Sequence, residues 1–131
     1  TATLYTIAQS INGRVANTSN YSKLYIGRPI QYGDLSGDFC PLANLISRDV
    51  IGIGRELGLP DEILERESED GLSGRTDEEN LGFTYEQLDD YLLGTGEVPP
   101  EVVEKIKKLH KATRHKYVPM PMFNNIKSEE K

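Results

Sequence analysis

Apolar side chains recur at helical spacing in four parts of this chain, and each part carries a start or stop signal. The first runs from Leu4 to Ile11 and is followed by Asn12-Gly13, a pair that typically ends a helix. The second starts at Ser47, which we predict to be its N-cap, and Gly58 closes it. The other two cover residues 85–93 and the stretch around 102–109.

Two capping boxes and one proline add further start points. Thr84 with Gln87 starts the helix over 85–93, and Thr76 with Glu79 is a second candidate box. Leu59-Pro60 begins a short helix that we expect to reach about residue 65.

Residues 14–18 follow the first helix and its tight turn, and they predict a short strand; residues 30–32 predict a second extended piece. Helix, turn and strand in this order indicate an α/β fold with a parallel sheet. Residues 66–79 carry charge, Gly and Ser without periodicity, which predicts a mobile loop. Residues 117–123 contain two prolines and cannot form a regular helix, and residues 124–131 predict a flexible tail.

Composition indicates one domain with a lean core. The 131 residues are 37% hydrophobic, with three Phe and no Trp, so we expect apolar surface that a partner or further chain covers. Because the chain opens on a helical pattern without Met, we also expect a longer parent protein.

The formal net charge is −6, which disfavours broad nucleic-acid binding, although the basic helix beyond residue 104 could meet a phosphate. No stretch is apolar enough to predict a membrane span, and no signal peptide is visible. The single cysteine, Cys40, excludes an internal disulfide and Cys-rich zinc motifs, and fits a cytoplasmic protein.

Small polar side chains directly follow the predicted strand. At the carboxyl end of a parallel strand they could donate hydrogen bonds to a phosphate or a ribose, or they could simply cap the next helix; they are Thr18, Ser19, Asn20 and Ser22. Asp34 and Asp38 could accept from an amine or a ribose hydroxyl or bind Mg²⁺, but Asx turns explain them equally well.

Near the end of the basic helix, His115 and Lys116 could contact an anionic ligand, or could complement the helix dipole. We expect His110 to be structural. The sequence shows no Cys/His or Ser/His/Asp pattern for nucleophilic catalysis, and no phosphate loop of the Walker or dinucleotide type.

Five segments in order resemble the C-terminal half of the ammonia-dependent NAD synthetases. They are residues 17–22, 32–45, 55–63, 76–92 and 110–123, and the block TDEENLGFTYEQLDDYL at 76–92 is the most specific. The resemblance covers nearly all of residues 1–131. It implies a Rossmann-like ATP-pyrophosphatase domain, that is, a parallel sheet flanked by helices, usually in a homodimer. It also implies a ligase of NAD biosynthesis that uses ATP, Mg²⁺ and ammonia to convert deamido-NAD into NAD through an adenylate.

The resemblance also assigns roles to particular residues. Thr18 matches a threonine that contacts ATP, and Ser68 stands in the closing loop where a threonine is usual. Asp38, His115 and Lys116 match residues that hold deamido-NAD. Three positions depart: the magnesium-binding glutamate falls on Lys23, a lysine for deamido-NAD on Gln31, and an ATP-contacting lysine on Ser47.

The family's pyrophosphate loop, Ser-Gly-Gly-x-Asp-Ser, does not occur in these 131 residues. We therefore expect this chain alone to be inactive and its parent to be the enzyme. Two alternatives remain from the departures and the lean core: a diverged, non-catalytic nucleotide-binding homologue, or a dimerisation fragment.

Overall fold

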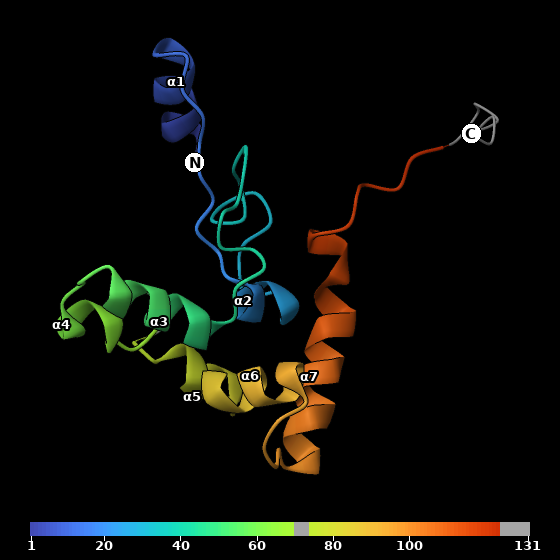
Figure 1. The fold of residues 1–131 in the computed structure, drawn as a ribbon. Coiled ribbons are helices and arrows are strands. Elements are labelled where there is room, and N and C mark those ends of the chain that lie inside the picture. The colour runs from blue at the N-terminus through green and yellow to red at the C-terminus, as the bar shows by residue number, and fades with distance from the viewer. Residues whose placement is uncertain (70–73, 124–131) are drawn as a thin grey trace, which may run out of the picture.

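The computed structural model describes residues 1–69 and 74–123, and within them the regular elements are helices (Figure 1). They are α1 (Ala2–Ser10), α2 (Tyr21–Tyr25), α3 (Ser47–Glu56), α4 (Asp61–Leu64), α5 (Asp77–Leu81), α6 (Tyr85–Leu93), α7 (Pro100–Thr113) and the 3₁₀ turn η1 (Arg114–Lys116). The helices predicted from periodicity and capping are all confirmed. Helix α2 has only five residues and is too short to show periodicity. The only sign of it in the sequence was the alternative that the polar residues after the predicted strand cap a following helix.

Local capping fixes several of these helix ends. The side chains of Thr76 and Thr84 accept the backbone N–H three residues on, so both predicted capping boxes are confirmed. Gly94 ends α6 in the left-handed conformation, as its lack of a Cβ permits. The predicted N-cap of α3 is off by one residue, because Ser47 is the first helical residue and Ile46 precedes it.

The predicted strand over 14–18 is wrong at that length. A single parallel bridge joins Ala16 to Phe39, with Asn17 N–H donating to the Phe39 carbonyl at 2.8 Å. Residues 31–35 form turns, so the predicted extended piece over 30–32 is also wrong. The described residues are therefore helix-rich, as predicted, but they do not contain the parallel sheet.

The core lies where α2, α6 and α7 meet. Its buried side chains are Ile26, Phe83, Leu88, Val102 and Ile106. Leu88 of α6 and Ile106 of α7 are fully buried, and each belongs to the apolar stripe that predicted its helix. On the other side of α6, Gly54 lets α3 approach α4, because a Cβ there would lie 2.5 Å from a Leu64 methyl carbon.

A buried carboxylate joins α2, α3 and α6. Asp89 of α6 is 1% exposed; one of its oxygens accepts the hydroxyl of Ser22, and the other accepts the Arg48 N–H at 2.9 Å. The Ser22 hydroxyl oxygen in turn accepts the N–H of Ser47 at 2.9 Å. The first two N–H groups of α3 are therefore satisfied by side chains of α2 and α6, and the positive end of its dipole faces the negative charge of Asp89.

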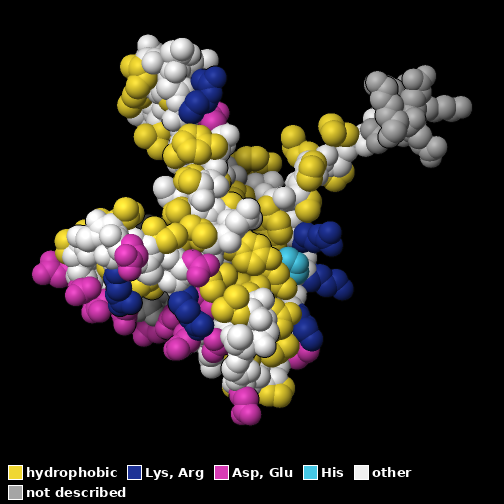
Figure 2. Space-filling view, in the orientation of Figure 1, with side chains coloured by type: hydrophobic (Ala, Val, Ile, Leu, Met, Phe, Trp, Pro, Cys, Tyr) yellow, Lys and Arg dark blue, Asp and Glu magenta, His cyan; other side chains and the backbone are white. Residues whose placement is uncertain are grey.

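Apolar surface remains uncovered, as the lean composition predicted. Helix α1 stands apart from the other helices (Figure 1), and Leu4 and Ile7 on it and Ile11 at its end are more than half exposed. Figure 2 shows acidic side chains gathered over α4 and α5 and basic ones along α7, which matches the charge runs in the sequence. No helix within residues 1–69 and 74–123 has the length and apolar character for a membrane span.

We predict that Asp89→Asn lowers the free energy of unfolding by about 2–3 kcal/mol, because an amide cannot accept both buried donors that the carboxylate satisfies. Urea unfolding followed by circular dichroism would measure this loss. Glu86→Gln removes a charge from an exposed position of the same helix and should leave stability within about 0.5 kcal/mol. Equal losses in the two variants would contradict this role of Asp89.

The phenol of Tyr25 predicts a loss of stability at high pH. Burial, and then hydrogen bonding with Tyr91, raise its pKa to about 12, against about 10 in an unfolded chain. The folded state thus favours the protonated phenol, so this contribution is complete below about pH 10 and is lost as pH rises from about 10 to 12. Urea unfolding at about pH 9 and about pH 11.5 should therefore show a smaller stability loss in Tyr25→Phe than in the unchanged protein.

Candidate functional site

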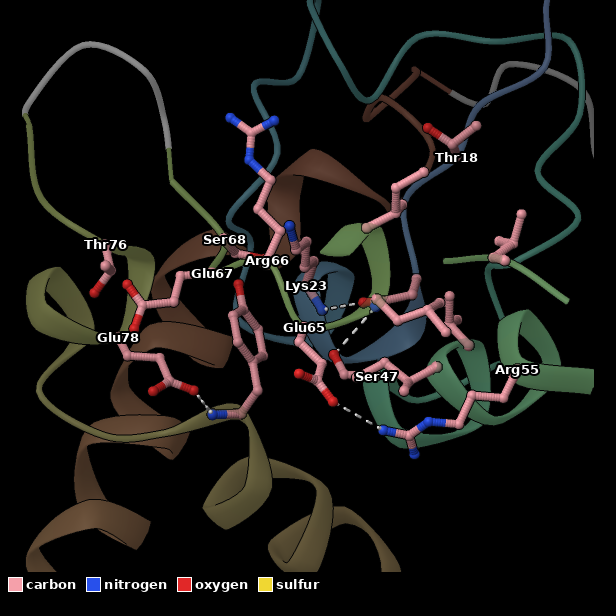
Figure 3. Close-up of a pocket in the computed structure, with 17 residues that line it drawn as sticks. Thr18, Lys23, Ser47, Arg55, Glu65, Arg66, Glu67, Ser68, Thr76 and Glu78 are labelled. Carbon is pink, nitrogen blue, oxygen red and sulfur yellow. Dashed lines mark hydrogen bonds and ion pairs between the residues drawn. The ribbon is translucent and has the colours of Figure 1, made fainter. Parts of the chain in front are cut away.

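Two neighbouring hollows share Thr18 and Lys23. The first hollow, of about 620 Å³, lies between α2, α3, the segment 65–68 and the start of α5. Figure 3 shows side chains from these parts around one space, with Ser47, Ser68 and Thr76 among them. The second hollow, of about 430 Å³, lies on the other side of Lys23 and is lined also by Ser19, Arg28, Pro29, Ile30, Asp34, Glu69 and Asp77.

Most of the polar run after the Ala16 bridge is used inside the fold. Asn17 is buried and donates to the carbonyl of Asp34 at 2.8 Å, and Asn20 caps α2 by accepting the Lys23 N–H. Ser22 is fully buried against Asp89. Thr18 is exposed and lines both hollows, so its hydroxyl is the one best placed to meet a ligand.

Asp77, the first residue of α5, is the buried charge at this site. Its carboxylate is 4% exposed and accepts the Nε–H of Arg28 at 2.9 Å and the hydroxyl of Tyr85 at 3.1 Å. Lys23 places its ammonium 3.8 Å from the other carboxylate oxygen. Asp77 thereby fixes two cations beside the hollows, and no periodicity or spacing in the sequence pointed to it.

The same carboxylate shapes the chemistry of Tyr85. Burial raises the pKa of this phenol well above its usual range, and the negative charge of Asp77 and the hydrogen bond to it raise the pKa further. Tyr85 therefore stays protonated, donates to Asp77, and presents its ring to Lys23, whose Nζ lies 5.8 Å from the ring centroid.

Ser68 lies where the resemblance places the closing loop. Its carbonyl accepts the N–H of Asp77 at 2.7 Å, and Glu69 forms an antiparallel bridge with Thr76. Ser68 lines the first hollow with Thr18, so the two residues that the resemblance assigns to ATP face one space. Residues 70–73 of the predicted 66–79 loop and the whole predicted tail 124–131 lie outside the described residues. The mobility of both segments stays a prediction.

The residues that the resemblance assigns to deamido-NAD lie away from this space. Asp38 is exposed beside α1 and accepts the Val15 N–H at 2.7 Å. Asp34, by contrast, lines the second hollow, and its carboxylate accepts the N–H of Ile30. His115 is exposed on η1, and the ammonium of Lys116 donates to backbone carbonyls. Within one chain Asp38, His115 and Thr18 thus share no hollow among those described, and their ligand roles stay predictions.

The position to which the resemblance assigns Mg²⁺ does not suit a dication. No group of three His, Cys, Asp or Glu side chains in the described ranges is arranged to hold a metal ion. The position that the resemblance gives to a metal-binding glutamate carries Lys23, whose positive charge lies beside both hollows and repels a dication. Position 23 therefore cannot supply a metal ligand.

Comparisons with known proteins identify the family of this chain. A family model described as NAD synthase matches residues 1–120. The chain belongs to the NAD synthase family.

Among curated relatives of the family, the NH(3)-dependent NAD(+) synthetase of Alkaliphilus metalliredigens is 44% identical over 126 residues, which are 95% of this chain and 50% of that protein. The synthetase of Syntrophomonas wolfei is 41% identical over 86% of this chain and 45% of its own length. The chain thus spans about half the length of the curated relatives that it matches.

Solved structures of family members share the fold. An NMN synthetase from Francisella tularensis superposes with a TM-score of 0.87 at 34% identity, over 95% of this chain and 52% of that one. An NH3-dependent NAD synthetase from Campylobacter jejuni gives 0.68 at 23% identity, over 94% and 50% of the two chains, and supports the fold alone.

We predict that Asp77→Asn lowers the pKa of Tyr85 without returning it to the usual range, because the negative charge is lost while burial remains. An alkaline titration followed by phenolate absorbance would measure the shift. Glu78→Gln is the matched control, since Glu78 has the smallest of the effects that raise this pKa. A shift in the control as large as in Asp77→Asn would contradict the assignment.

Proposed function

We propose that this chain is part of an ammonia-dependent amide-forming ligase that acts on a nicotinate nucleotide. The observation that carries the proposal is the first hollow, where Thr18 and Ser68 face one space beside Lys23. Membership of the NAD synthase family supports the same reaction class.

The proposed chemistry activates a poor acyl donor. The nicotinate carboxylate attacks the α-phosphorus of ATP, and the bond to pyrophosphate breaks. Ammonia then attacks the carbonyl carbon of the adenylate, loses a proton, and displaces AMP to leave the amide. Negative charge develops on phosphate oxygens in the first step, so cations and hydroxyl donors at fixed positions would stabilise it.

In this scheme Thr18 and Ser68 donate hydrogen bonds to ATP, and Lys23 takes part as a cation instead of as a metal ligand. Any Mg²⁺ would then be held by ATP phosphates and by groups other than the side chain at position 23. Because Asp77 lies 3.8 Å from the Lys23 ammonium, it sets the position of that positive charge before ATP arrives.

We further propose that the Ala16–Phe39 bridge belongs to the parallel sheet of the complete domain. Such a sheet would cover the exposed apolar side chains of α1. Since Asp38 and His115 lie away from both hollows, they would reach a nucleotide bound in a second copy, as in a homodimer. A reaction that consumes ATP and free ammonia fits the cytoplasm.

Two nicotinate substrates are possible, and the structure gives a reason to test both. The NMN synthetase superposes with a higher TM-score than the NAD synthetases compared with it, 0.87 against 0.68 and 0.57. Gln31 also stands where the resemblance places a lysine for deamido-NAD. A mononucleotide has one phosphate instead of two, so a site with one cation fewer suits nicotinate mononucleotide.

The experiment supplies the complete protein with ATP, Mg²⁺ and ammonia, and either nicotinate mononucleotide or deamido-NAD. We expect AMP and an amide product, and the ratio of the two kcat/KM values decides the substrate. No AMP with either acid would reject the ligase and favour a non-catalytic homologue.

In the same assay, Thr18→Ala should raise the KM for ATP by about 2–10-fold, the effect of losing one hydrogen bond. Thr6→Ala is the control, because the Thr6 hydroxyl bonds to the Ala2 carbonyl within α1. An unchanged KM in Thr18→Ala would remove Thr18 from the ATP site.

A further inference from the structure

The end of α7 and η1 hold the carboxyl end of α2. The Tyr25 carbonyl accepts from His110 Nδ1 at 2.8 Å and from the Tyr117 hydroxyl at 3.2 Å. Because a carbonyl oxygen can only accept, His110 carries a proton on Nδ1. The His110 ring also stacks on the Tyr25 ring, with centroids 4.0 Å apart, in the structural role expected for it.

Lys116 continues this contact into the next turn. Its ammonium donates to the carbonyl of Gly27 at 2.6 Å and to that of Pro29 at 3.0 Å. Gly27 has a φ of +66°, and a Cβ there would lie 2.1 Å from the Cβ of Thr113. The turn 27–29 is therefore pressed against the end of α7, and two of the three ammonium N–H groups of Lys116 are used to hold it.

The residue between those two carbonyls reaches the candidate site. The Arg28 guanidinium donates to the buried carboxylate of Asp77 and lines the second hollow together with Pro29. Asp77 in turn holds Lys23, which both hollows share. A chain of direct contacts thus runs from Lys116 through the 27–29 turn to the two cations of the site.

We propose that Lys116 is a positioning residue: it fixes the 27–29 turn so that Arg28 stays on Asp77 and the second hollow keeps its wall. A Lys116 that contacted a nucleotide directly would have to release both carbonyls first. This role follows from the contacts of Lys116 alone, and only the identity of the ligand bound in the second hollow rests on the proposed function.

The first test is hydrogen exchange, measured by mass spectrometry on peptides covering residues 24–33 of the complete protein. The N–H groups of Gly27 and Arg28 are bonded to the carbonyls of Leu24 and Lys23. In Lys116→Met, which keeps the length of the side chain without its donors, we expect these amides to exchange at least about tenfold faster. Peptides from α6 should be unaffected, and Lys116→Arg should restore most of the protection.

Lys111→Met is the matched control, because Lys111 is an exposed lysine on α7 with no hydrogen bond among the described residues. It should leave exchange of the Gly27 and Arg28 amides unchanged. Unchanged exchange in Lys116→Met, or the same increase in Lys111→Met, would overturn the proposal. This test needs no turnover, so it decides the role of Lys116 even if the ligase activity is absent.

The second test is a double-mutant cycle on the KM for the nicotinate nucleotide that the protein uses. If Lys116 acts through Arg28, Lys116→Met combined with Arg28→Met should be no worse than Arg28→Met alone. If Lys116 touches the nucleotide itself, the two fold-increases in KM should multiply. Multiplying effects would overturn the proposal and return Lys116 to the ligand contact that the resemblance implies.

Discussion

The carboxylate of Asp89 is the interaction on which the rest of the structure depends. A buried carboxylate is costly unless donors surround it, and here a hydroxyl from α2 and an N–H from α3 do so. The same group fixes where α3 begins, because the first N–H groups of that helix have no partner in their own helix. Since α2 and α3 both line the first hollow, this charge on α6 helps to set the shape of that hollow.

A second buried aspartate, Asp77, organises the charged side chains of the candidate site. It ties the start of α5 to Arg28 and Lys23, and so gives position 23 a role that needs no metal. A glutamate placed at position 23 would face Asp77 and add a second negative charge, which Arg28 alone would have to balance. The lysine at 23 and the Asp77–Arg28 pair therefore form one charge arrangement, in which position 23 departs from the residue that the resemblance implies.

Thr18 and Lys116 show that a match to a family position does not by itself fix the role of a side chain. Both match positions to which the resemblance gives a ligand contact, but only Thr18 opens into the hollows. The Lys116 ammonium instead donates hydrogen bonds to the carbonyls of Gly27 and Pro29. Whether a polar side chain is available to a ligand depends on the partners that its own fold supplies, and a motif does not record those partners.

The sequence by itself determined the local features: the capping boxes at Thr76 and Thr84, the stop at Gly94 and the apolar stripes of α6 and α7. These features depend on residues within about four positions of one another, so residue type and spacing are enough to predict them. The resemblance added the family and the grouping of Thr18 with Ser68. Only the tertiary structure decided that the predicted strand is reduced to one bridge, because a strand needs partners that lie far along the chain. It also decided that Asp77 and Asp89 are buried, since a carboxylate on a helix looks solvent-exposed until distant donors surround it.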